Sequence, residues 1–233
     1  MDPYKKLAHY YDSDWGNFSY KYLDFLDLVF SKFKINPSSI WDISCGSGNV
    51  VSVLSKKGFN IIGSDISEEM IRVSKNKSPD INFFVMDMRE LESNKKFDLI
   101  LSGFDSINYI LELGEVNEIF LKVKNLLNED GIFIFDVTTP YNYKLSYVGE
   151  YNRKVNEKII KQNESYDPIT KIAKVEYNLD GFKEIHKQRA YTYQEIKDIL
   201  NKNLFSILGV YEDFDLSIVN DYSNRLFFIC KKS

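Results

Sequence analysis

The sequence has few of the residues that build metal centres and disulfide frameworks. Its 233 residues include two cysteines, Cys45 and Cys230, and two histidines, His9 and His186. Disulfide-dependent folds are far richer in cysteine, and zinc sites need clustered Cys and His ligands. We therefore expect neither a disulfide scaffold nor a bound metal.

Long apolar runs and an excess of positive charge are also missing. No apolar run approaches the roughly 20 residues of a membrane span, and residues 1–6 lack the apolar core of a signal peptide. The 30 Lys and Arg residues are scattered and are outnumbered by 34 Asp and Glu, for a net charge of −4. A large nucleic-acid footprint is therefore not evident. We expect a soluble cytoplasmic protein whose partner is a small molecule, with nucleic acid disfavoured and no membrane partner; oligomeric state has no signal in the sequence.

Short apolar runs are what the sequence does contain. Hydrophobic residues make up 44% of the chain, enough for one large core. Nearly continuous runs of this kind suit strands buried on both faces, and helical stretches lie between them. The alternation predicts an α/β fold with an open parallel sheet. The expected strands cover residues 40–43, 61–64, 83–86, 97–101 and 132–135, and the helices 18–33, 50–57, 68–75 and 116–127.

The pattern changes after Pro140. Val175, Tyr177 and Leu179 alternate with polar residues, which predicts a half-exposed antiparallel strand within a small excursion. Thr192 followed by Glu195 predicts a capping box that starts a helix over 192–202. Two further strands, near 206–211 and 225–230, are expected to pair at an antiparallel edge. We divide the chain into lid or flanking helices (1–34), a core (35–140 and 192–233) and an antiparallel cap (141–191).

A glycine-rich turn follows the first expected strand. Gly46 and Gly48 there allow close approach of a ligand to the backbone, at the sheet edge where open α/β folds bind ligands. Asp65 ends the second strand about 20 residues on, where a carboxylate can accept both hydroxyls of a ribose. Asp87 ends the third and precedes Met88, a pair suited to an adenine amino group and ring face. Each acid alone is more often a turn or helix-capping residue, but three aligned strand ends predict a nucleoside site.

One feature of dinucleotide-binding turns is absent. Val51 occupies the position where their fingerprint has a third glycine. The expected ligand is therefore an adenosine that carries something other than a pyrophosphate. Asp42, at the start of the turn, could hold a cationic amino group.

These segments resemble the motifs of class I S-adenosylmethionine-dependent methyltransferases, from about residue 35 onward. A narrower similarity, to sugar N-methyltransferases of antibiotic pathways and uncharacterised bacterial relatives, rests on residues 8–12 and 103–110 and on the excursion before 189–191. The motifs of the broader resemblance are 42–48 (Asp-Ile-Ser-Cys-Gly-Ser-Gly), 65–70 (Asp-Ile-Ser-Glu-Glu-Met), 87–89 (Asp-Met-Arg), 97–100 (Phe-Asp-Leu-Ile) and 127–135. Ser44 stands where many members have glycine or alanine.

The resemblance implies a Rossmann-like, seven-stranded mixed sheet, mostly parallel with an antiparallel last strand, and methyl transfer from S-adenosylmethionine (EC 2.1.1.-). Asp65 would hold the ribose, Asp87 and Met88 the adenine, and Asp42 and Gly46 the methionyl part. The full set of implied cofactor residues is Tyr11, Asp42, Ser44, Cys45, Gly46, Gly48, Asp65, Ile66, Met70, Asp87, Met88, Arg89 and Ser102.

The acceptor side has no motif that names a substrate. An amine acceptor needs no base in an in-line displacement, whereas a hydroxyl acceptor does, and His9 or Asp105 would be the candidates. We also keep open an RNA-base acceptor, with Lys154, Lys158 and Lys161 on phosphates, and a protein that binds the cofactor without catalysis. Candidate substrate residues are Trp15, Asn108, Tyr109, Arg189, Tyr191 and Arg225.

Overall fold

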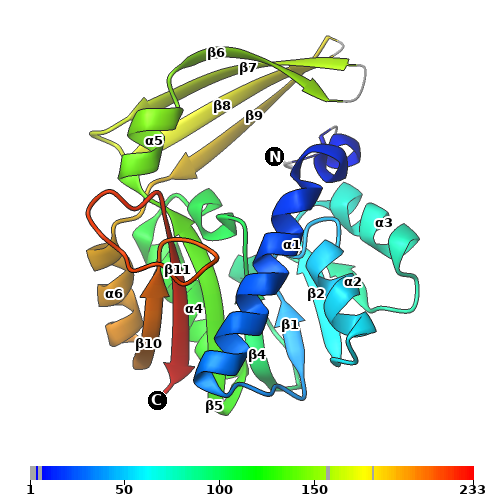
Figure 1. Ribbon diagram of the computed structural model, residues 1–233, viewed down its shortest axis with the longest axis vertical. Helices are drawn as coiled ribbons and strands as arrows, with labels where there is room; N and C mark the ends of the chain where they lie inside the picture. Colours follow the sequence, from blue (N-terminus) through cyan, green and yellow to red (C-terminus); the bar gives the residue numbers. More distant parts are fainter. Residues whose placement is uncertain (1–3, 5–6, 156–157, 180) are drawn as a thin grey trace.

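The computed structural model describes residues 4, 7–155, 158–179 and 181–233, and only the backbone of residues 9–17. In this part of the chain the strands form a seven-stranded sheet and a separate four-stranded sheet (Figure 1). The strands of the seven-stranded sheet and the helices of the core are α1 (Ala8–Phe33), β1 (Ile40–Asp42), α2 (Asn49–Lys56), β2 (Ile61–Asp65), α3 (Glu68–Lys77), β3 (Phe83–Val85), η1 (Met88–Glu90), β4 (Phe97–Ser102), η2 (Ser106–Tyr109), α4 (Leu113–Leu126), β5 (Leu127–Thr138), α6 (Tyr193–Lys202), β10 (Phe205–Tyr211) and β11 (Arg225–Lys232).

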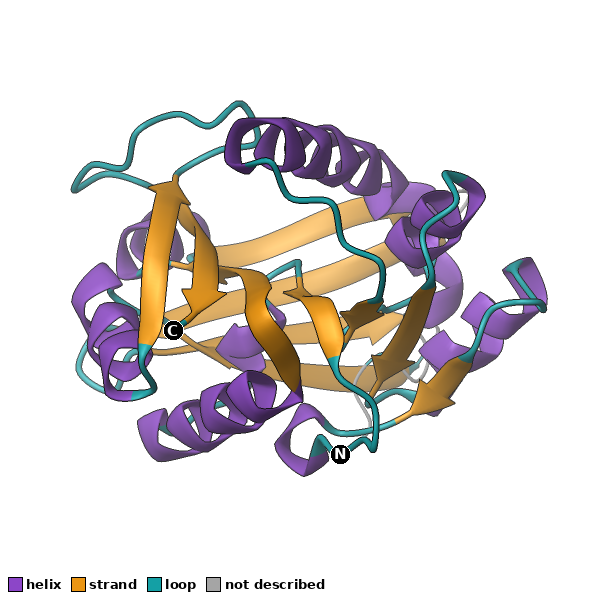
Figure 2. Cartoon of the chain, turned by 90° about the horizontal axis from the view of Figure 1, so that it is seen from below, coloured by secondary structure: helices purple, strands orange, loops and turns teal. Residues whose placement is uncertain are grey.

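The large sheet has the strand order β10-β11-β5-β4-β1-β2-β3. Strands β5, β4, β1, β2 and β3 are parallel, and β11 is antiparallel to both of its neighbours. Helices cover both faces of the sheet (Figure 2). The expected Rossmann-like α/β fold, with a mostly parallel sheet and an antiparallel last strand, is confirmed. The parallel strands β1, β2 and β3 end side by side at one edge, which is what positions the site.

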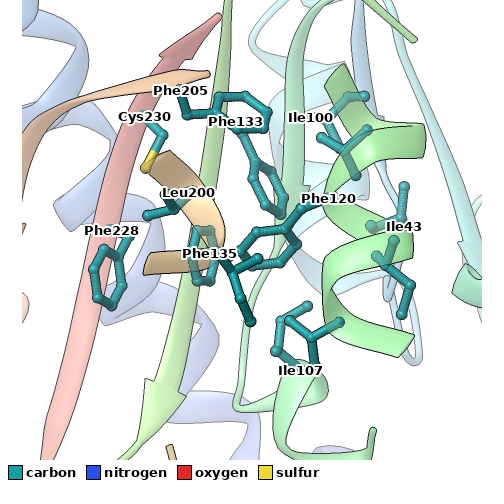
Figure 3. Packing of buried hydrophobic residues seen from close by; sticks show 14 of the residues in the cluster. Ile43, Ile100, Ile107, Phe120, Phe133, Phe135, Leu200, Phe205, Phe228 and Cys230 are labelled. Atoms are coloured by element: carbon teal, nitrogen blue, oxygen red, sulfur yellow. The ribbon is translucent and has the colours of Figure 1, made fainter. Parts of the chain in front are cut away.

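Strand β5 shows why the strands of the sheet appear in the sequence as continuous apolar runs. Phe133 and Phe135 face one helical layer, while Ile132 and Ile134 face the other, as the two-residue period of a strand requires. The rings of Phe133 and Phe135 stack with centroids 4.6 Å apart, and Phe228 of β11 stacks on Phe135 at 5.0 Å (Figure 3). This aromatic layer anchors the centre of the sheet.

The helix expected over 18–33 is longer in the structure, because α1 begins at Ala8. Its buried residues Tyr22, Phe25, Leu26 and Val29 pack into the hydrophobic cluster on one face of the sheet. This part of α1 is thus a core helix.

The excursion forms the second sheet, which lies over one end of the large sheet (Figure 1). It follows the short helix α5 (Pro140–Ser146), and each of its strands pairs antiparallel with the next. In β9 alternate residues Glu184, His186 and Gln188 are buried, so the sheet has a buried polar row. Leu7, just before α1, packs in a cluster with residues of this sheet. The strands are β6 (Gly149–Val155), β7 (Lys158–Asp167), β8 (Ile172–Leu179) and β9 (Phe182–Arg189).

The capping box at the start of α6 is confirmed. The backbone N–H of Glu195 donates to Thr192 Oγ1 at 3.2 Å, and the backbone N–H of Thr192 donates to Glu195 Oε2 at 2.9 Å. We expect Thr192→Ala to lower the free energy of unfolding by about 1 kcal/mol, because a helix N–H loses its acceptor. Urea denaturation measures this loss. Thr192→Ser keeps the hydroxyl and should keep most of the stability; equal losses in both variants would contradict the capping role.

Among the described residues, no helix combines the length and apolarity needed to cross a membrane.

Candidate active site

A pocket of about 580 Å³ lies between the carboxyl ends of the parallel strands and strand β9 of the small sheet. The structure brings Asp42, Asp65 and Asp87 together in its wall, where they end or follow β1, β2 and β3. Tyr109 of η2 and His186 of β9 also line it. The pocket is therefore built by both sheets.

The glycine turn wraps closely over the start of α2. Gly48 has φ +78, and a Cβ there would lie 2.8 Å from Ser74 Cβ and 2.9 Å from the ring of Phe83. Both the backbone conformation and the lack of space therefore require glycine. Gly46 also has a positive φ, and its N–H donates to Asp65 Oδ2 at 2.9 Å. The turn is thus fixed to the end of the neighbouring strand.

Asp65 organises this corner of the pocket. Besides the bond from Gly46, its Oδ1 accepts the backbone N–H of Ser67 at 2.9 Å, and Ser67 in turn caps α3. A carboxylate has about four acceptor positions, and hydroxyl groups of a ligand are suitable donors to it. The geometry fits a carboxylate that both braces the glycine turn and receives a diol.

Asp42 is the most deeply buried of the three acids, at 5% exposure. Burial raises its pKa to about 7; the backbone N–H of Ser44, which donates at 3.1 Å, opposes this shift, and the nearby charge of Asp65 adds to it. A buried carboxylate of this kind is stabilised in its charged form by a cation. The site therefore fits a ligand with a positively charged group next to the glycine turn.

Asp87 is held by its neighbour Arg89. The guanidinium Nη2 of Arg89 lies 2.6 Å from Asp87 Oδ2, and the backbone N–H of Arg89 donates to Oδ1 at 2.9 Å. Burial raises the pKa of Asp87, but these hydrogen bonds outweigh it and hold that pKa below its ordinary value. Met86 and Met88 line the pocket beside this pair and supply apolar surface for a flat ring.

The remaining cofactor candidates divide by position. Ser102 ends β4 and is buried, and its Oγ lies 3.1 Å from Ser44 Oγ. The described wall of the pocket includes neither Ser102 nor Gly48. Tyr11, like the candidates His9 and Trp15, has its side chain outside the described residues. The cofactor candidates that line the pocket are Asp42, Ser44, Cys45, Gly46, Asp65, Ile66, Met70, Asp87, Met88 and Arg89.

Asp105, one of the two candidate bases, is held in a charged cluster. Its Oδ1 accepts from Arg225 Nη2 at 2.9 Å, and its Oδ2 accepts from Gln188 Nε2 at 2.5 Å. Arg225 also pairs with buried Asp136, which accepts the backbone N–H of Asp105 at 2.9 Å. The described wall of the pocket includes neither Asp105 nor Arg225. The cluster joins the loop after β4 to β5, β11 and the small sheet.

Three other substrate candidates make their hydrogen bonds and ion pairs where the small sheet rejoins the core. Asn108 receives the N–H of Thr138 at 2.9 Å and donates to the carbonyl oxygens of Thr138 and Arg189 at 2.9 and 2.8 Å. The side chain of Arg189 pairs with Glu195 at 2.9 Å. The hydroxyl of Tyr191 donates to the carbonyl of Ile110. Of the substrate candidates whose side chains are described, Tyr109 lines the pocket and these three do not.

The sequence did not predict three polar residues of the wall. Tyr4, Glu184 and His186 line the pocket beside Tyr109, which was predicted there. Strand alternation places Glu184 and His186 on the same face of β9, which was the available signal. That signal does not say which face of an inserted sheet covers the core.

The fold and the pocket together define a methyltransferase of class I, and the comparisons agree. A family model described as "Methyltransferase domain" matches residues 40–131. A putative methyltransferase of Geobacillus sp. is 30% identical over 246 residues, which cover 98% of this chain and 99% of the relative. This chain belongs to the class I S-adenosylmethionine-dependent methyltransferase family, and S-adenosylmethionine is its cosubstrate.

Solved structures show the same relationship. An S-adenosylmethionine-dependent methyltransferase from Clostridium acetobutylicum is 26% identical, with a TM-score of 0.86 and 98% of each chain covered. An amino pentose methyltransferase from Micromonospora echinaspora, solved with S-adenosylmethionine bound, is 14% identical, with a TM-score of 0.74 and coverage of 99% of this chain and 96% of its own. The second likeness shows the shared fold.

Proposed function

We propose that this methyltransferase acts on a small molecule. The observation that carries the proposal is the pocket of about 580 Å³, whose wall joins the strand-end acids to the small sheet. A pocket in the usual size range for small ligands, about 300–1,000 Å³, has room for a nucleoside-sized donor and a compact acceptor. The Micromonospora relative, which acts on an amino pentose, is consistent with an acceptor of this size.

The residues would divide the work as follows. S-adenosylmethionine supplies a methyl group on a sulfonium sulfur. Asp65 would receive the ribose hydroxyls, Asp42 would neutralise the amino group, and Met88, Ile66 and Met70 would pack on the adenine. The small sheet would exclude water and hold the acceptor in line for displacement, since positioning alone can supply about 7–11 kcal/mol.

Binding and turnover test this proposal in sequence. We expect calorimetry to show saturable one-to-one binding of S-adenosylmethionine and S-adenosylhomocysteine. We then expect the protein, offered a fractionated pool of small metabolites, to release S-adenosylhomocysteine with some fractions and not with buffer. Binding without release from any fraction would instead support a protein that binds the cofactor without catalysis.

An RNA acceptor is the competing possibility, and salt distinguishes it. Lys154, Lys158 and Lys161 are all exposed on β6 and β7 of the small sheet. If they contacted phosphates, RNA affinity would fall steeply as salt rises. We expect RNA binding to be weak at every salt concentration and RNA to remain unmethylated. Methylated RNA would overturn the small-molecule proposal and leave the family assignment intact.

A further inference from the structure

A chain of hydrogen bonds runs from the pocket into the small sheet. The hydroxyl of Tyr109 lies 2.8 Å from Nδ1 of His186, and Nε2 of His186 lies 2.7 Å from Oε1 of Glu184. The hydroxyl of Tyr4 lies 2.7 Å from that of Tyr109. All four residues line the pocket. The order phenol, imidazole, carboxylate is the order of a base oriented by an acid.

Burial protects these hydrogen bonds from water. His186 is 4% exposed and Glu184 is 7% exposed. The rings of Tyr4 and Tyr177 meet the imidazole edge-on, at 4.7 and 5.1 Å between centroids, and Tyr109 lies on a third side. Charged and titratable groups therefore face His186 from the segment before α1, from η2, from β8 and from β9 itself.

The partners decide where the protons lie. A carboxylate only accepts, so Glu184 fixes the imidazole proton on Nε2 and leaves Nδ1 as an acceptor for the Tyr109 hydroxyl. Glu184 Oε1 also accepts the backbone N–H of Tyr4, at 2.5 Å, which favours its charged form. Burial raises the pKa of Tyr109 well above its ordinary value, so its phenol keeps its proton. Its oxygen can then accept a proton from a molecule in the pocket as it passes its own to His186.

We infer that Tyr109, His186 and Glu184 form a proton relay for an acceptor hydroxyl, so that the methylated atom is oxygen. This inference rests on the proposed small-molecule function. The acceptor oxygen forms a bond to the methyl carbon as the carbon–sulfur bond breaks and its electron pair returns to sulfur. The hydroxyl proton passes to the Tyr109 oxygen, the Tyr109 proton passes to Nδ1, and Glu184 stabilises the resulting imidazolium.

A hydroxyl acceptor needs a general base, whereas an amine acceptor does not. An amine reaches the site as a free base after losing its proton to water, and positioning is then enough. An alcohol or phenol keeps its proton until the transition state, where a general base contributes about 10²–10⁴-fold. A buried, oriented base in the acceptor part of the pocket is therefore suited to a hydroxyl.

The tautomer of His186 provides a test that needs no acceptor. The chain has two histidines, so nitrogen-15 NMR of imidazole-labelled protein, compared with His186→Gln, assigns the signal of His186. We expect a neutral ring protonated on Nε2, in the full-length protein with S-adenosylhomocysteine present. A resting ring protonated on Nδ1 would overturn the relay. Calorimetry on the same sample reports cosubstrate binding separately, so failure of the proposed function is distinguished from failure of the relay.

Kinetics give the second test, with matched probes: phenol and aniline, benzyl alcohol and benzylamine, cyclohexanol and cyclohexylamine. We expect His186→Gln and Tyr109→Phe to slow hydroxyl methylation by about 10²–10⁴-fold and to remove the rise of rate with pH, while cosubstrate affinity is unchanged. Glu176→Gln, on β8 with Lys174 and Lys183 as its partners, is the control and should keep both rate and profile.

Two kinetic results would overturn the relay. One is an unchanged pH profile for hydroxyl methylation in His186→Gln. The other is methylation confined to the amine members of the pairs. Where none of the probes reacts, the tautomer decides the question alone.

Discussion

Replacement of Asp65 by alanine is expected to weaken S-adenosylmethionine binding by about 10²–10⁴-fold, because two hydrogen bonds from a ribose to a charged acceptor contribute about 1.5–3 kcal/mol each. The same change removes the acceptor of the Gly46 and Ser67 N–H groups, so the glycine turn loses its anchor on β2. Isothermal titration calorimetry measures the effect.

The matched control is Asp80→Asn, which alters an exposed acid in the turn before β3. It should bind like the parent protein. Circular dichroism and thermal unfolding of the Asp65 variant show whether the fold survives. A folded Asp65→Ala protein with undiminished affinity would remove Asp65 from the ribose position.

The second large effect is a dependence of cosubstrate affinity on pH that arises from Asp42. Burial raises the pKa of this carboxyl to about 7 in the free protein, and a bound cationic amino group favours its ionised form. Binding is therefore coupled to loss of one proton. We expect affinity to rise about 50-fold from pH 5 to pH 7, the change for a single group with a pKa of about 7, and then to level off. Calorimetry across this range tests the expectation.

Asp42→Asn separates this effect from other titrations. The variant should bind weakly at every pH and lose the rise between pH 5 and pH 7. Stability changes in the opposite sense: because the folded-state pKa is raised, ionising Asp42 costs stability as pH rises from about 4 to about 7. Without cosubstrate, the variant should therefore become more stable relative to the parent over that range. A parallel pH dependence in both proteins would assign the titration to another group.

The elements that were predicted well have strong local signals. Runs such as 132–135 are apolar at every position, which is typical of strands buried on both faces, and the pair Thr192 and Glu195 indicates the start of a helix. Asp42, Asp65 and Asp87 could be placed at one edge because parallel strands end together. Each of these inferences uses only a few neighbouring residues and the geometry of one element.

The acceptor side was harder because it depends on side-chain direction after a turn. Asp105 and Asn108 follow β4 in the region expected to face substrate, yet their side chains bind Arg225, Gln188 and the backbone around Thr138. The positive φ of Asp105, +51, turns the chain at this point, and no local pattern predicts it. His186 is the converse case, since its environment is assembled from segments distant in the sequence.

The path of the chain makes the small sheet a contiguous insertion in the core. The chain leaves the core after Thr138 and re-enters it at Tyr191, whose N–H donates to the carbonyl of Thr138 at 3.4 Å. The side chain of Asn108 donates hydrogen bonds to the carbonyl oxygens of Thr138 and Arg189, at the two ends of the excursion. A contiguous module whose ends meet is the kind of segment that tolerates exchange as one unit. Under the proposed function, grafting the corresponding segment between relatives would exchange the part of the pocket wall that the small sheet supplies, while the strand-end acids stay the same.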